Sequence, residues 1–201
     1  KSNSFSLNNT LSLIGGKSFE DVMGANVSLV GDDNAYGVAL YQSYRNRQQY
    51  DHDGDGFSEL GKLSAHTFGV NGFYRPTHFS RLGLEYHTTN EFRRGGNKFD
   101  LEPLFTDITE MTRHVINSGG VNYDLFWKEY AHKLSIYSSV QHVDRYSYYG
   151  AQQNPDAYGK TKDLTYVGGA TYTGKFSSML FAPGTLTAGV EYQYNSLHDI
   201  M

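Results

Sequence analysis

The sequence alternates apolar and polar side chains with a period of two in stretches of about ten residues or more. In residues 4–14, Phe5, Leu7, Leu11 and Leu13 alternate with Ser, Asn and Thr, and residues 184–197 repeat the pattern. Successive side chains of a strand point to opposite faces, so each such stretch has one apolar and one polar face. The alternation therefore predicts long β-strands.

Nine strands are predicted, and the connections between them alternate between short and long. The strands are expected at 4–14, 24–31, 35–50, 64–75, 80–91, 112–126, 131–146, 161–175 and 184–197. Short connections are expected at 32–34, 76–78, 127–130 and 177–183, and long ones at 15–23, 51–63, 92–111 and 147–160. Such an order is typical of an antiparallel up-and-down meander with one clipped end and one elaborated end.

Charged residues fall almost wholly on one face of the predicted strands. The apolar face carries Tyr36, Val38, Leu40, Phe68, Val70, Tyr74, Leu82, Leu84, Tyr86, Val121, Tyr123, Leu125, Leu134, Ile136 and Val140. Because Arg or Lys at a bilayer midplane costs about 2–4 kcal/mol, this sorting favours an all-β transmembrane barrel, seen here as a partial barrel of about nine long strands. The alternative is a soluble sandwich with aromatic-rich edges, whose strands are usually nearer five or six residues.

The composition excludes several other classes of protein. No run approaches the ~20 apolar residues of a spanning helix. The chain has no cysteine, so it can form neither a disulfide nor a thiolate metal site, and its net charge of −4 argues against a nucleic-acid partner. We find no nucleophile elbow, phosphate loop or paired catalytic carboxylates, and therefore expect no enzyme. Bacterial barrels have even strand numbers, so residues 1–201 are expected to be a single segment of a longer barrel domain.

The segment 51–59 carries the sharpest local signal. Asp51, Asp53 and Asp55 alternate with other residues and are followed by glycine and Glu59. Calcium takes six to eight oxygen ligands, and glycine permits the sharp turn that brings later ligands round. We expect a structural calcium site formed by the side chains of Asp51, Asp53, Asp55 and Glu59 and the carbonyl of Phe57. The alternative is a solvated acidic loop.

Two further segments supply candidate substrate-binding residues in loops. Arg93 and Arg94 precede two glycines, where they can contact a ligand or hold the base of an ordered loop. Tyr146, Tyr148 and Tyr149 form an aromatic loop tip suited to stacking on a bulky ligand, and equally to an interfacial girdle.

Several of these segments together resemble the barrel of TonB-dependent outer-membrane receptors of the vitamin B12 and siderophore receptor type. The resemblance rests on residues 50–60, 91–96, 107–110, 114–116 and 119–124, with weaker support from 186–192. It implies a barrel of about twenty-two strands with a plugged lumen. It also implies import of a scarce ligand (cobalamin, a siderophore or another metal chelate) across the outer membrane of a Gram-negative bacterium.

The resemblance also implies partners and a cofactor. Energy would come from TonB through a plug domain, which residues 1–201 lack, and outer-membrane lipid would surround the strands. Calcium bound by loop aspartates in such receptors corresponds here to Asp51, Asp53 and Asp55. The alternative functions are a passive porin or structural barrel, and a soluble Tyr-rich module that binds glycans.

Overall fold

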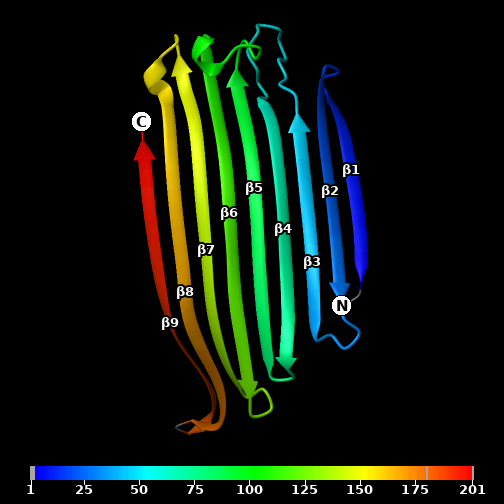
Figure 1. Cartoon of the computed structure of the whole chain (residues 1–201), viewed down its shortest axis with the longest axis vertical. Helices are drawn as coiled ribbons and strands as arrows, with labels where there is room; N and C mark the ends of the chain where they lie inside the picture. The colour runs from blue at the N-terminus through cyan, green and yellow to red at the C-terminus, as the bar shows by residue number, and fades with distance from the viewer. Residues whose placement is uncertain (1–2, 180, 201) are drawn as a thin grey trace.

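The protein folds as one sheet of nine antiparallel strands, whose order in space is their order in the chain (Figure 1). This computed structural model describes residues 3–179 and 181–200. The strands are β1 (Ser4–Ile14), β2 (Ser18–Val30), β3 (Tyr36–Arg47), β4 (Lys62–Thr77), β5 (Ser80–Gly96), β6 (Ile108–Trp127), β7 (His132–Ala151), β8 (Tyr158–Met179) and β9 (Ala182–Ile200). Two short 3-10 turns, η1 (Pro103–Phe105) and η2 (Pro155–Ala157), lie in the longer connections.

The predicted all-β, up-and-down meander is confirmed, and the sheet is open. Each strand pairs with its sequence neighbours, and β1 and β9 form the two edges. The connections after β2, β4, β6 and β8 lie at one end of the sheet, here called the turn end (Figure 1). The acidic loop and both 3-10 turns lie at the other, the loop end.

The first connection at the loop end is short, so the predicted long connection at 15–23 is wrong. The strand β2 begins at Ser18, and Gly15 and Gly16 form the turn with φ of 56° and 71°. Two consecutive residues with positive φ suit a tight turn, here closed by the N–H of Lys17 donating to the Ile14 carbonyl at 3.1 Å, because that geometry matches the twist of the flanking strands. Phe19 and Met23 lie on the same face of β2 as Leu13 does on β1, whereas Asp21 between them interrupts the apolar pattern in the segment that we expected to be a loop.

The register brings the apolar residues of all nine strands onto one face. Leu40 lies opposite Val70, and Val70 lies opposite Tyr86. The same face, which we call the apolar face, continues through Val121, Ile136, Ala170 and Val190. No second layer covers it, so Ile136 stays 50% exposed and Val190 75% exposed. The buried apolar side chains of the described residues are instead Leu63, Met111 and Tyr148, near the loop end.

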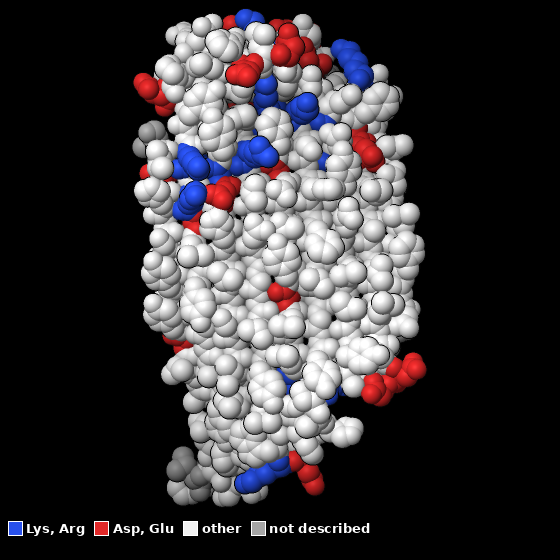
Figure 2. Space-filling view, in the orientation of Figure 1, with Lys and Arg blue, Asp and Glu red and all other residues white. Residues whose placement is uncertain are grey.

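A belt without charged residues crosses the apolar face. On β8 the apolar-face positions in 164–174 carry no charge, and the same holds for 115–127 on β6 and 132–142 on β7. Figure 2 shows few charged residues across the middle of the face and more toward its two ends. At the turn end Trp127 stacks on His132 with ring centroids 5.5 Å apart, and on Tyr172 at 5.9 Å.

The opposite face, the polar face, carries ion pairs and hydrogen bonds between neighbouring strands. Arg45 on β3 pairs with Glu20 on β2 at 2.7 Å, and Lys133 pairs with Asp124 at 3.0 Å. These cross-strand contacts place opposite charges side by side, which supports the register. Within the described residues, no helix has the length and the apolar character needed to cross a membrane.

Candidate functional site

The candidate site lies in the loop between β3 and β4, which is closed by an isolated β-bridge. The backbone N–H of Tyr50 donates to the carbonyl of Leu60 at 2.8 Å, and the reverse bond measures 3.2 Å. This bridge pinches the chain so that residues 51–59 form a compact turn. Four acidic residues of one short segment are thereby held on the same small loop.

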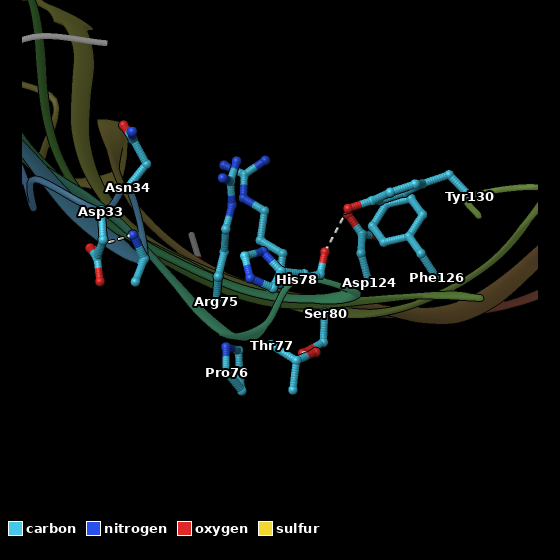
Figure 3. Close-up of a pocket in the computed structure, with 12 residues that line it drawn as sticks. Asp33, Asn34, Arg75, Pro76, Thr77, His78, Ser80, Asp124, Phe126 and Tyr130 are labelled. Atoms are coloured by element: carbon cyan, nitrogen blue, oxygen red, sulfur yellow. Dashed lines mark hydrogen bonds between the residues drawn. The ribbon is translucent and has the colours of Figure 1, made fainter. Parts of the chain in front are cut away.

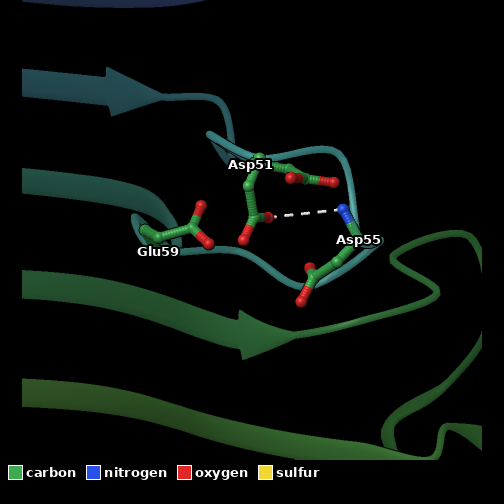
Figure 4. Close-up of side chains that lie close together, drawn as sticks. Asp51, Asp55 and Glu59 are labelled. Atoms are coloured by element: carbon green, nitrogen blue, oxygen red, sulfur yellow. Dashed lines mark hydrogen bonds between the residues drawn. The ribbon is translucent and has the colours of Figure 1, made fainter.

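Asp51 lies in this loop with Asp55 and Glu59 (Figure 4) and organises it through backbone hydrogen bonds. Its Oδ1 accepts from the N–H of Gly54 at 2.6 Å and its Oδ2 from the N–H of Gly56 at 2.9 Å. Gly54 and Gly56 have φ of 82° and 90°, a conformation that glycine adopts without the steric cost of a Cβ. The two glycines therefore let the chain turn back over the Asp51 carboxylate.

The remaining carboxylates are fixed in the same way. Asp55 accepts from the N–H of Phe57 at 2.8 Å, Glu59 accepts from the N–H of His52 at 2.6 Å, and Asp53 makes a longer bond of 3.3 Å to the N–H of Asp55. Asp51, Asp53, Asp55 and Glu59 each offer one oxygen, and these oxygens all lie within 4.8 Å of one another. Gathered carboxylates repel unless a cation or protons neutralise them, and an all-oxygen donor set fits a hard cation such as calcium.

The structure brings together four of the five predicted metal ligands. The fifth, the carbonyl of Phe57, lies in the same loop and stays a prediction. The loop is also tied to β5, because the N–H of Ser58 donates to the Gly96 carbonyl at 3.0 Å and the Ser58 hydroxyl accepts from the Gly96 N–H at 3.2 Å. The site is therefore held both by its own hairpin, β3–β4, and by the end of β5.

Arg93 and Arg94 belong to β5, so their predicted placement in a loop is wrong. As adjacent strand residues they point to opposite faces. Arg93 pairs with Glu91 at 2.8 Å on the polar face. Arg94 is 8% exposed, donates to the carbonyl of Lys98 at 3.2 Å and lies over the ring of Phe99. The two side chains therefore cannot contact the same ligand, and Arg94 stabilises the start of the loop that follows β5 through its hydrogen bond to Lys98.

The tyrosine segment also lies in a strand, contrary to the predicted loop tip. Tyr146, Tyr148 and Tyr149 belong to β7, and Tyr148 is fully buried. Tyr158 packs against both Tyr146, at 5.6 Å between ring centroids, and Tyr148, at 4.6 Å. Buried Tyr148 is not available to a ligand, whereas Tyr146 and Tyr149 remain exposed on opposite faces.

A clasp between Asn97 and Asp107 closes the loop after β5, and sequence reasoning missed it. Asn97 donates to Asp107 Oδ2 at 2.7 Å, and the N–H of Asp107 donates back to Asn97 Oδ1 at 3.2 Å. Lys98 bonds the other oxygen, Oδ1, at 2.8 Å. The hydrogen bond from Lys98 and then that from Asn97 lower the pKa of the Asp107 carboxyl. The only sign of this pairing in the sequence is that Asn97 and Lys98, two hydrogen-bond donors, precede the carboxylate of Asp107 by about ten residues.

A cleft of about 630 Å³, whose lining residues Figure 3 shows, opens at the turn end, and the acidic loop lies at the other end of the sheet (Figure 1). Arg75, Arg81 and His78 line it, and both guanidinium groups lie over the ring of Phe73, at 5.5 and 5.1 Å. Tyr130 closes one side by donating to the carbonyl of His78 at 2.8 Å. Asp33 and Asp124 share the lining, so the cleft has mixed charge.

In comparisons with known proteins, no protein-family model, no curated protein and no solved structure matches the chain.

Proposed function

We propose that the chain is part of an outer-membrane receptor that binds a scarce ligand and imports it with energy transmitted by TonB. The ligand class is cobalamin, a siderophore or another metal chelate. The observation that carries the proposal is the uncharged belt on one face of a long antiparallel meander, with an acidic, cross-braced loop beyond one end of it. The resemblance of residues 50–60, 91–96, 107–110, 114–116 and 119–124 to such receptors supports the same assignment.

The belt supports the membrane part of the proposal. A strand needs about 9–11 residues, tilted, to span the hydrocarbon core, and residues 164–174 of β8 meet this length without a charge on the apolar face. Hydrocarbon is the occupant that such a face favours, because burying apolar surface contributes about 25 cal/mol per Å². Trp127 and Tyr172 at the turn end suit the membrane–water interface, where aromatic rings gather.

The acidic loop supports the receptor part. Calcium held by Asp51, Asp53, Asp55 and Glu59 would cancel their repulsion and fix a loop that already has its backbone hydrogen bonds. A fixed loop binds ligand with less loss of conformational entropy than a mobile one. The two hydrogen bonds between Ser58 and Gly96 would extend this order to the neighbouring strand β5.

The energy requirement separates this proposal from the passive alternatives. The test is uptake of radiolabelled cobalamin and of a radioiron-loaded hydroxamate siderophore by cells that carry or lack the gene for the protein, with and without a functional TonB. We expect gene-dependent uptake of one probe that stops when TonB is removed. Uptake that persists without TonB would favour a passive porin, and a protein recovered in the aqueous fraction without detergent would favour a soluble glycan-binding module.

A further inference from the structure

Three basic side chains lie on the apolar face directly beyond the loop-end border of the belt. They are Arg113 on β6 and Lys160 and Lys162 on β8, here called the basic cluster. Figure 2 shows Lys and Arg gathered over the upper parts of β6 to β8. Charge is expected on the polar face of these strands, so its presence on the apolar face requires an explanation.

The register places the three cations in two adjacent rows. Arg113 lies opposite Tyr146, and Tyr146 lies opposite Lys160. Lys162 lies opposite Asp144 in the row nearer the belt. The next apolar-face position of β8 toward the belt is Leu164, so the charge begins one step, about 7 Å, beyond the last apolar side chain.

The basic cluster carries more positive charge than its neighbours neutralise. Arg113 and Lys160 form no ion pair within 4.0 Å among the described residues. The nearest carboxylate is Asp144, whose oxygens lie 4.0 Å from Lys162 Nζ and 3.7 Å from His142 Nδ1. The three exposed cations therefore have one carboxylate nearby, that of Asp144. Arg113 and Lys160 form no ion pair with it or with any other described residue.

A groove of about 430 Å³ adjoins Arg113 on the same face. Phe92, Met111, Tyr44 and Tyr146 contribute to its lining, so it is mostly apolar with a cation at its edge. Glu91, also in the lining, is occupied by its pair with Arg93 at 2.8 Å. An apolar groove beside unpaired cations matches a molecule with an apolar part and an anionic head.

We propose that the basic cluster binds the phosphorylated headgroup of an anionic membrane lipid, with part of the lipid's apolar portion in the groove. The proposal rests on the proposed function, because it needs the belt to be embedded in a bilayer. Arg113 would contact phosphate through two parallel N–H donors, and Lys160 and Lys162 would act as point charges. The position of the basic cluster along the strands fits this ligand, because lipid headgroups begin where the hydrocarbon ends and the cluster begins where the belt ends.

The test uses the full-length protein extracted from membranes into dodecyl maltoside micelles, with diphosphoryl lipid A as the probe and phosphatidylcholine as the uncharged comparison. Lipid retention is counted by native mass spectrometry over a titration of the probe. The variant is Arg113→Gln/Lys160→Gln/Lys162→Gln. The matched control, Arg75→Gln/Arg145→Gln/Lys175→Gln, removes the same charge from residues outside the apolar face.

We expect wild type and control to retain lipid A in preference to phosphatidylcholine, and the triple variant to bind it at least tenfold more weakly. A cation near an anionic lipid surface contributes about fivefold in affinity, the equivalent of about 1 kcal/mol. Equal weakening in the control, or full retention in the triple variant, would overturn the lipid site while leaving the membrane assignment intact. A wild-type protein that stays in solution without detergent would overturn the proposed function and the lipid site with it.

Discussion

Asn97 and Asp107 exchange two hydrogen bonds across the base of the loop that follows β5, at 2.7 and 3.2 Å. Asn97 is 6% exposed, so its amide would be costly to bury without these partners. The pairing joins the end of β5 to the start of β6, and Lys98 adds an ion pair to it. This contact gives the loop a fixed closure that depends on one ionised carboxylate.

The first prediction concerns the pH dependence of that closure. Because Lys98 and Asn97 lower the Asp107 pKa, the carboxylate stabilises the folded loop fully above the unfolded value of about 3.9. That stabilisation is lost as the pH falls through the lower, folded pKa. Hydrogen exchange of residues 97–107 should therefore accelerate below about pH 4 beyond its intrinsic rate. Asp107→Asn should remove this pH response, and an unchanged response in that variant would contradict the assignment.

The second prediction concerns calcium binding by the acidic loop. Asp53→Asn/Asp55→Asn removes two of the four gathered carboxylates and should weaken calcium binding at least tenfold, because ligand charge sets the affinity of such sites. Isothermal titration calorimetry with calcium provides the measurement. The matched control is Asp32→Asn/Asp33→Asn in the turn between β2 and β3, which should bind as wild type does. Equal affinity in all three proteins would show that the loop is merely acidic.

The third prediction concerns Gly96, where the acidic loop meets β5. Its φ is 108°, and an added Cβ would meet the carbonyl oxygen of Ile108. Gly96→Ala should therefore lower the free energy of unfolding by about 1–3 kcal/mol, and it should also weaken calcium binding through the lost contacts with Ser58. Gly95→Ala is the control, because its Cβ would meet only the Ser58 hydroxyl at 3.9 Å. Similar losses in both variants, measured by denaturant titration in detergent, would refute this account of Gly96.

The fourth prediction uses Trp127, the one tryptophan of the chain. Its place beside His132 and Tyr172 at the turn end puts it at the proposed membrane–water interface. Its fluorescence should be quenched more by lipids brominated near the headgroup than by lipids brominated near the chain ends. In Trp127→Phe/Ile136→Trp the order should reverse, because position 136 lies within the belt. The same order in both proteins would contradict the assignment of the belt.

The fold was largely readable from the sequence, because alternation with a period of two is a local signal. It located all nine strands and the faces of residues such as Val70 and Ile136. It underestimated the strands near the loop end, as at Tyr148 and Arg94, where buried polar and aromatic contacts replace the simple alternation. Gly15 and Gly16 both have positive φ and form a tight turn, which the predicted long connection at 15–23 missed.

The candidate site, like the fold, could be predicted from the sequence only in part. The acidic loop was predictable because its residues are close in sequence and its glycines permit the turn. The Asn97–Asp107 clasp and the basic cluster were not, since each depends on which residues the register brings together. The opposite directions of Arg93 and Arg94 follow from strand geometry only once both residues are known to lie in β5.

The most direct test of the central claim compares the two faces of β7 at adjacent serines. Ser138 lies opposite Val121 and Gly168 on the apolar face, whereas Ser139 lies opposite Gly120 and Val167 on the polar face. The chain has no cysteine, so Ser138→Cys and Ser139→Cys each give one site for a nitroxide label. In native outer-membrane lipid, the label at 138 should be relaxed by oxygen and shielded from a water-soluble nickel complex, and the label at 139 should show a lower ratio of oxygen to nickel accessibility. Equal accessibility to the nickel complex at both positions would contradict the embedding of the apolar face in lipid.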